Sequence, residues 1–209
     1  MAGGPASADD RLLEQLERSR ALGFLGPGPV ADQVEHTQAF LRAIADVSGV
    51  VVDLGSGGGV PGLIVAVARP DLEVVLLDAT AKRCTFLEQA LGELGLDARC
   101  EVVQGRAEVV GRSERRGSAD AVLARSFGPP AATAECAAPL LRVGGRLVVS
   151  EPPDGGDRWP PAGTALLGLE PEPPAAEDGG PHLRILRQAR PCDQAYPRRD
   201  GIPAKRPLF

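Results

Sequence analysis

A glycine-rich loop is the first place in the sequence where residue types and spacing could do chemistry. The stretch VVDLGSGGGVPGL, residues 51–63, passes from an apolar run through Asp53 into five glycines within the eight residues 55–62. Glycine lets a backbone turn sharply and approach a ligand closely. An expected strand precedes the loop and an expected helix follows it, so its amides can face a ligand at the helix N-terminus. The loop therefore predicts a nucleotide-type ligand.

Several ligand classes compete for this loop. A phosphate-binding P-loop requires a Lys-Ser/Thr pair after the glycines, and none follows here. A dinucleotide fingerprint, G-x-G-x-x-G, is present at Gly57, Gly59 and Gly62. Asp53 stands two residues before Gly55, however, and a buried acid repels a pyrophosphate but attracts a sulfonium or ammonium. We therefore favour S-adenosylmethionine bound by Asp53, Gly55, Gly57 and Gly59, with a dinucleotide or a ligand-free turn as alternatives.

A second acid, Asp78, ends the apolar run EVVLLDA. The carboxyl ends of parallel strands share one edge of the sheet, where ligands bind. Dinucleotide and methyl-donor sites both place an acid at the end of this strand for ribose hydroxyls. Asp78 therefore predicts a bound ribose without choosing the cofactor.

Strand-like and helix-like segments alternate from residue 50 to residue 150. Strands are expected at 50–54, 74–77, 101–103, 120–124 and 146–150, and helices at 61–68, 80–95 and 129–141. This alternation predicts an α/β fold with a mostly parallel central sheet flanked by helices. Two further helices are expected at 9–22 and 32–47, the first with Leu12, Leu13, Leu16 and Leu22 near one face.

Three parts follow from these segments. Residues 1–48 form an N-terminal helical extension, 49–190 the ligand-binding domain and 191–209 an extended basic C-terminal tail. Within the domain, residues 151–181 contain eight prolines and six glycines, which predicts an irregular acidic segment. His182 to Ala189 is expected to form a late edge strand.

Charge is distributed unevenly at this end of the chain. The formal net charge is −5, but residues 151–181 hold seven acids against one base, and residues 182–209 hold seven bases against two acids. Local patches rather than the total charge steer a protein towards phosphate. A nucleic-acid partner therefore stays open.

The composition narrows the class of protein. With 209 residues, of which 43% are hydrophobic, the chain suits one α/β domain with short extensions. No apolar run approaches the roughly 20 residues that span a bilayer, and no signal-peptide pattern opens the chain. We expect a cytoplasmic protein with no membrane partner. The four cysteines lie far apart and only two histidines accompany them, so no metal site is expected.

Several motifs in this sequence resemble one family. They include GVPGL, RPDLEVVLLDA, KRCTFLE, GRAE, ADAVLARSFGPP and PLLRVGGRLVV, with FLGPGPVADQVEH before them and YPRRDGIPAKRPL in the tail. Together they resemble the ribosomal small-subunit methyltransferase G family, also called glucose-inhibited division protein B, over roughly residues 24–150 and 195–208. The resemblance implies a Rossmann-like class I fold and methyl transfer from S-adenosylmethionine to N7 of a guanine in 16S rRNA.

The same resemblance assigns roles to individual residues. Gly55 and Val60 would line the methyl donor, and Ala107 and Glu108 would meet its adenine part. Arg125, in ARSF at the end of the fourth strand, would act in cofactor binding and catalysis. Guanine N7 presents a free lone pair, so the reaction asks for alignment rather than a general base.

Candidate RNA contacts cluster in the tail. A basic, extended segment can bind phosphate and a tyrosine can stack on a base. The tail candidates are Tyr196, Arg198, Arg199, Lys205 and Arg206. Outside the tail, the resemblance adds His36, which matches a histidine of the family near the substrate side. The alternative is a tail that packs back on its own domain, with His36 as a helix-surface residue. The expected partner is 16S rRNA or the small ribosomal subunit, and the expected state is a monomer.

Three positions depart from the family pattern. Glu35 stands where an arginine is usual, Glu151 where a lysine is usual, and Ser126 where an alanine is usual. Negative charge facing RNA weakens binding. Two alternatives therefore remain: a diverged methyltransferase acting on another RNA or a small molecule, and a non-catalytic RNA- or ribosome-binding relative.

Overall fold

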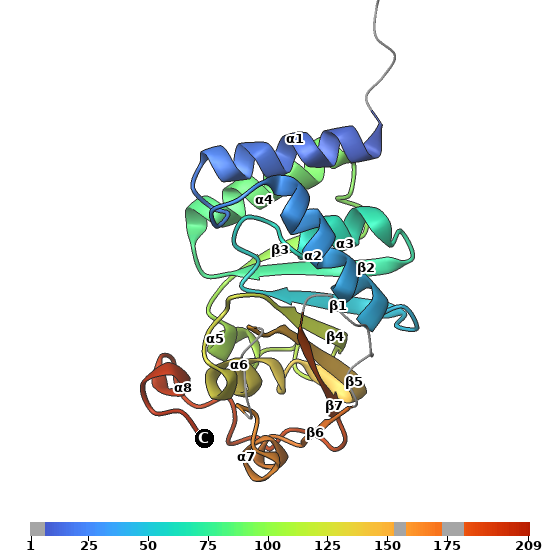
Figure 1. Cartoon of the computed structure of the whole chain (residues 1–209). Coiled ribbons are helices and arrows are strands. Elements are labelled where there is room, and N and C mark those ends of the chain that lie inside the picture. The colour runs from blue at the N-terminus through green and yellow to red at the C-terminus, as the bar shows by residue number, and fades with distance from the viewer. Residues whose placement is uncertain (1–6, 153–157, 173–181) are drawn as a thin grey trace, which may run out of the picture.

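A twisted sheet runs through the centre of the molecule (Figure 1). The computed structural model describes residues 7–152, 158–172 and 182–209. The parallel strands are β1 (Gly49–Leu54), β2 (Leu72–Asp78), β3 (Cys100–Gln104), β4 (Ala119–Ala124) and β5 (Leu141–Ser150). Antiparallel β7 (Leu183–Gln188) pairs with β5, and β6 (Leu169–Pro171) pairs with β7, which gives the order β3-β2-β1-β4-β5-β7-β6.

The central strands are apolar because helices cover both of their faces. In β1 the residues from Val51 to Leu54 are buried, and in β2 the buried run extends from Val74 to Asp78. Strands of parallel sheets that are buried on both sides read as continuous apolar runs. This explains why the Val- and Leu-rich segments predicted the parallel strands within a few residues.

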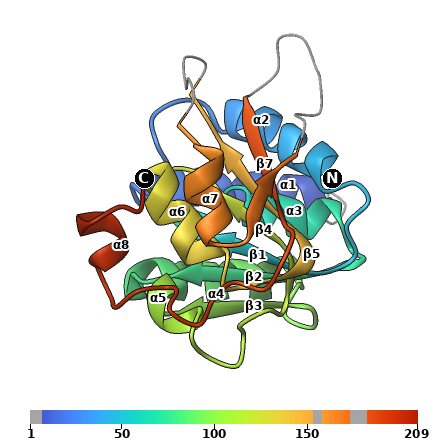
Figure 2. The same cartoon turned by 90° about the horizontal axis from the view of Figure 1, so that it is seen from below.

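Each face of the sheet carries its own hydrophobic core. Helices α1 (Ala8–Ala21), α2 (Val30–Ala43), α3 (Gly62–Ala68) and α4 (Ala81–Leu94) cover one face. The short helices α5 (Ala107–Val110), α6 (Pro130–Ala137), α7 (Pro161–Leu166) and α8 (Ile202–Lys205) lie on the other side (Figures 1 and 2). The predicted α/β fold with helices on both faces is confirmed.

Helix α1 is an amphipathic helix with a well-formed start. Ser7 Oγ accepts from the Asp10 amide at 3.1 Å, and Asp10 Oδ2 accepts from the Ser7 amide at 3.2 Å, a reciprocal cap. Leu12 and Leu16 face the core. Leu13 is 43% exposed, so its predicted place on the same face is wrong: consecutive helical residues point about 100° apart.

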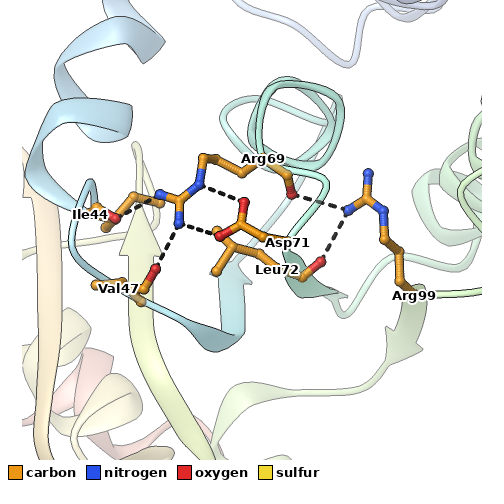
Figure 3. A network of polar contacts seen from close by, with 6 residues as sticks. All are labelled: Ile44, Val47, Arg69, Asp71, Leu72 and Arg99. Atoms are coloured by element: carbon orange, nitrogen blue, oxygen red, sulfur yellow. Dashed lines mark hydrogen bonds and ion pairs between the residues drawn. The ribbon is translucent and has the colours of Figure 1, made fainter.

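A polar network ties the loops together at the amino ends of the strands (Figure 3). The Arg69 guanidinium donates to the carbonyls of Ile44 and Val47 at 2.9 and 2.7 Å and is also bonded to Asp71. Arg99 Nη1 donates to the Leu72 carbonyl at 3.0 Å. These bonds satisfy loop carbonyls at the edge of the sheet opposite the glycine loop. We therefore assign this network a structural role: it stabilises the loops that lead into the strands.

Several expectations for residues 151–209 need correction. The segment 151–181 contains helix α7 and strand β6, while 153–157 and 173–181 lie outside the described residues. Strand β7 is not at the edge, because β6 pairs along its outer side. The tail 191–209 is not extended throughout, since it includes α8, which lies beside α6 (Figure 2). Proline is tolerated in the first turn of a helix, where Pro203 stands.

Candidate functional site

A cavity of about 240 Å³ opens at the carboxyl ends of the strands on the side of α5, α6 and α8. Strand order reverses between β1 and β4, which is where ligands bind in open α/β sheets. The walls come from Gly55, residues 77–79, 105–108 and 127–129, two residues of α6 and two of α8. Gly55 of the glycine loop and Asp78, the last residue of β2, therefore line the same cavity.

The glycine loop has a backbone conformation that residues with a side chain rarely adopt. Gly55 and Gly57 have φ of 74° and 55°, in the left-handed region. A Cβ built on Gly55 would lie 2.6 Å from the ring of Phe127, so a side chain there would collide with the cavity wall. Gly59 also has a positive φ, and its neighbourhood is filled by Leu63 rather than by the cavity.

Asp53 lies beneath the loop, at the end of β1, and is buried. Its Oδ2 accepts from the Gly62 amide at 3.0 Å. Burial raises the pKa of Asp53 to about 7, although the Gly62 hydrogen bond opposes this. The nearby Asp78 charge raises that pKa further, and the Arg125 charge lowers it. A positively charged ligand beside this carboxyl would favour its ionised form.

Asp78 is part of the cavity wall and also holds the loop in place. Its Oδ2 accepts from the Gly57 amide at 2.9 Å, and its Oδ1 accepts from the Thr80 amide at 2.7 Å. Arg83 approaches the same carboxylate at 3.6 Å. The predicted ribose-binding acid and the predicted glycine loop are therefore bonded directly to each other.

Ala107 and Glu108, expected at the adenine part of the donor, line the same cavity where β3 leads into α5. Glu108 is buried and accepts from Arg106 at 3.2 Å and from the Gly201 amide at 2.9 Å. Burial alone would raise the pKa of Glu108, but these two hydrogen bonds hold it below its usual range. The carboxylate is therefore ionised at neutral pH.

Arg125 directly follows β4 and is half-buried. Within the described part of the chain it makes no hydrogen bond or ion pair, although Asp53 acts on it electrostatically. Burial lowers the pKa of Arg125, and the Asp53 charge opposes that effect. Ser126, next in the chain, has φ 56°, a strained backbone typical of functional turns. The guanidinium is left available for a ligand.

His36, on α2, reaches the carboxyl end of β5. Its Nε2 lies 2.9 Å from Ser150 Oγ, and its ring packs near Phe40. Burial lowers the pKa of His36, and the charge of Arg125 lowers it further. His36 and Arg125 therefore belong to one electrostatic neighbourhood at the strand ends, where the two were expected to meet substrate.

The wall of the cavity includes residues that sequence reasoning missed and omits five that it proposed. The five are Asp53, Gly57, Gly59, Val60 and Arg125. Val60 is buried in the hydrophobic core under α3 and does not line the cavity. Phe127, Cys136, Pro203 and Ala204 do line it. Phe127 could have been found from its place two residues after Arg125, whereas Pro203 and Ala204 come from the far end of the chain and carry no local signal.

The tail candidates for RNA contact fall into two groups. The Arg198 guanidinium donates to the buried Glu135 at 2.9 and 2.6 Å. Tyr196 packs against the hydrophobic core on the face of the sheet that α5 to α8 cover. For these two the structure favours a tail that packs back on its own domain. Arg199, Lys205 and Arg206 are exposed, so their side chains can reach a polyanion.

The acidic departures from the family pattern have different surroundings. Glu35 is exposed on α2. Glu151 forms an ion pair with Arg158 at 3.2 Å, and its amide donates to the His182 carbonyl. An ion pair offsets much of the charge that Glu151 would otherwise present to RNA.

No three His, Cys, Asp or Glu side chains of residues 7–152, 158–172 and 182–209 lie together as metal ligands would. Within the same ranges, no helix has the length and apolar character needed to cross a bilayer.

Comparisons with known proteins agree with this geometry. The profile of the family described as rRNA small subunit methyltransferase G matches residues 31–151. A protein of that name from Rubrobacter xylanophilus is 38% identical over 94% of this chain and 80% of its own length. Another, from Moorella thermoacetica, is 37% identical over 76% of this chain and 69% of its own length.

A solved structure supports the same architecture. The antibiotic-resistance methyltransferase Kmr superposes with a TM-score of 0.52 at 19% identity, covering 72% of this chain and 92% of that chain. This likeness concerns the fold, whereas the profile and the sequence relatives concern the family. The chain therefore belongs to the rRNA small subunit methyltransferase G family.

Proposed function

We propose that this protein transfers a methyl group from S-adenosylmethionine to N7 of a guanine in 16S rRNA of the small ribosomal subunit. The observation that carries the proposal is the cavity at the switch point, which Gly55 of the glycine loop, Asp78 and Glu108 line together. The buried Asp53 lies outside the wall but close enough to Asp78 for the two charges to interact. We also propose that the protein acts as a monomer and that it acts in the cytoplasm.

The residues present fit this donor. A Cβ on Gly55 would lie 2.6 Å from the Phe127 ring, so glycine at this position lets the loop and Phe127 line the cavity side by side. Asp53 sits where a cationic methionyl end would stabilise its carboxylate, and Asp78 and Glu108 offer acceptors along the rest of the cavity. S-adenosylmethionine, when bound, supplies an electrophilic methyl group.

The chain's own residues supply alignment. Guanine presents N7 and O6 as acceptors. The Arg125 guanidinium, which has no hydrogen bond or ion pair among the described residues, can donate to O6 or to a phosphate while leaving N7 free. S-adenosylmethionine, held beside Asp78 and Glu108, would supply the methyl group to the N7 lone pair and would leave as the uncharged thioether, so the transfer balances without a further reagent. No protein group has to remove a proton, and the low pKa of His36 suits an uncharged positioning role.

The test is tritium transfer from labelled S-adenosylmethionine to small subunits that lack the native methylation, and to naked 16S rRNA. Donor binding is measured on the same protein sample. Label recovered as 7-methylguanosine supports the proposal. Tight donor binding without label in rRNA would instead indicate a diverged methyltransferase with another substrate. RNA binding without donor binding would indicate a non-catalytic relative.

Arg125→Ala sharpens this experiment. We expect transfer to fall by at least about 100-fold, because misplacing the acceptor in a positioning-driven reaction costs that much. The matched control is Arg20→Ala, on α1, where the guanidinium pairs with Glu17 on the molecular surface. Equal rates for Arg125→Ala and wild type would remove Arg125 from the mechanism.

A further inference from the structure

Residues 198–205, which we name the C-terminal strap, lie against the mouth of the donor cavity. The strap contains α8, and two of its residues, Pro203 and Ala204, line the cavity opposite the strand ends. Pro203 is buried and Ala204 is exposed. A segment from the end of the chain therefore supplies one side of a site whose other walls come from residues 55–136.

The base of the strap is anchored firmly to α6. The Arg198 amide donates to Glu135 Oε1 at 2.7 Å, and its guanidinium donates to both carboxylate oxygens at 2.9 and 2.6 Å. Glu135 is fully buried, so this carboxylate depends on Arg198. Arg198 also donates to the Arg206 carbonyl at 2.6 Å, which ties the start of the strap to the residue that directly follows it.

The tip of the strap is joined to the cavity wall itself. The Gly201 amide donates to Glu108 Oε1 at 2.9 Å, and Asp200 forms an ion pair with Arg106. Gly201 reaches this position with φ 72°. Both partners, Arg106 and Glu108, line the cavity, so the strap's position and the cavity's shape are coupled.

We infer that the strap is a structural part of the donor site, with Pro203 and Ala204 contacting the purine ring and Gly201 positioning them. The inference rests on the proposed function, because it takes S-adenosylmethionine as the ligand. Near the strap the wall is mostly apolar, with Ala107, Phe127 and Cys136 facing the same space. Such surroundings suit the flat face of a heteroaromatic ring. Ribose and methionyl groups instead belong beside Asp78 and Asp53.

Ala204→Leu tests the contact directly. Binding of S-adenosylhomocysteine and of adenosine is measured by calorimetry. We expect the larger side chain to weaken both ligands by about tenfold or more, which corresponds to about 1.4 kcal/mol. Equal losses for the two ligands are expected because the strap meets the purine they share. Ala162→Leu, at an exposed position of α7 away from the cavity, is the control.

Gly201→Ala tests the positioning role without entering the cavity. A Cβ at Gly201 meets no atom within 4 Å, so the substitution acts only through the backbone, which a positive φ makes costly. Gly95→Ala is the matched control, since Gly95 has φ 70°, equally empty surroundings and a place at the end of α4. We expect S-adenosylhomocysteine binding to weaken only in the Gly201 variant, although both variants lose similar thermal stability.

The outcomes separate this inference from the proposed function. If the wild-type protein binds the donor and Ala204→Leu binds it equally well, the strap's role is overturned while the proposed function stands. Equal donor affinity for Gly201→Ala and Gly95→Ala removes Gly201 as a positioning residue. Wild-type protein that binds neither S-adenosylmethionine nor S-adenosylhomocysteine overturns the proposed function and the inference together.

Discussion

Asp53 retains its proton at a pH where most aspartates have lost theirs, because burial makes the charged form costly. The pKa of about 7, against an ordinary value of 3.8, means that the ligand-free fold loses stability as pH rises between these values. The nearby charge of Arg125 partly offsets that cost. At the scale of one residue, Asp53 is a buried acid whose ionised form a bound cation would favour.

This arrangement predicts how donor affinity depends on pH. We expect S-adenosylhomocysteine to bind more tightly as pH rises from about 5.5 to about 7.5, by up to about tenfold per pH unit, because its ammonium group favours ionised Asp53. Below the Asp53 pKa, binding must first displace a proton. Calorimetry at several pH values measures the slope. Asp53→Asn should flatten the profile, and an unchanged slope in that variant would assign the titration to another group.

Helix α6 and the strap show how a polar pair can join distant elements. Glu135 and Arg198 are 63 residues apart in the sequence, and the contact places a carboxylate in the interior where water cannot solvate it. Removing one partner of such a pair is costlier than the net contribution of the pair, because a buried charge is left behind. The fold at the end of the chain therefore depends on this contact.

Arg198→Ala should lower the free energy of unfolding by about 3 kcal/mol, since among the described residues it leaves Glu135 a single hydrogen bond, from the backbone amide of residue 198. Arg199→Ala removes the next guanidinium, which is exposed, and should change stability by less than about 0.5 kcal/mol. Urea unfolding of both variants gives the comparison. Equal free energies of unfolding for the two variants would mean that water or another group replaces the hydrogen bonds that Arg198 gives to Glu135.

Across the whole molecule, the N-terminal helices belong to the same core as the sheet. Leu12 and Leu16 of α1 and Phe40 of α2 pack in one cluster with β1, β2, α3 and α4. The boundary at residue 48 was drawn from the sequence pattern, whereas the packing joins both sides of it in one hydrophobic core. We propose that the two parts unfold together. A single cooperative transition is the expected behaviour of such a domain.

Leu16→Ala tests this integration. Leu16 is fully buried, so its truncation should lower the free energy of unfolding by about 2–5 kcal/mol, while far-UV and near-UV signals still change in one transition. Leu13→Ala, one residue away and largely exposed, should stay within about 0.5 kcal/mol of wild type. Early loss of helical signal in Leu16→Ala, with the sheet intact, would show that the extension unfolds separately.

Local sequence patterns predicted much of the fold and part of the candidate donor site. Runs such as EVVLLDA predicted β2, because buried parallel strands are apolar on both faces. Asp78 and the glycine loop were paired correctly, since neighbouring parallel strands end at the same edge. Strand β6 was missed: Leu169–Pro171 is short and proline-containing, and it forms only because β7 offers an open edge.

By itself the sequence determined the chemistry at the strand ends: an acid, glycines and a second acid in a fixed order along adjacent elements. These features are encoded within short stretches, so spacing alone reveals them. Only the tertiary structure decided that Val60 belongs to the core, that Arg198 pairs internally and that Pro203 and Ala204 reach the cavity. Each of those outcomes depends on contacts between residues that are far apart in the sequence. Such contacts are set by the packing of the whole chain, which no short stretch of sequence encodes.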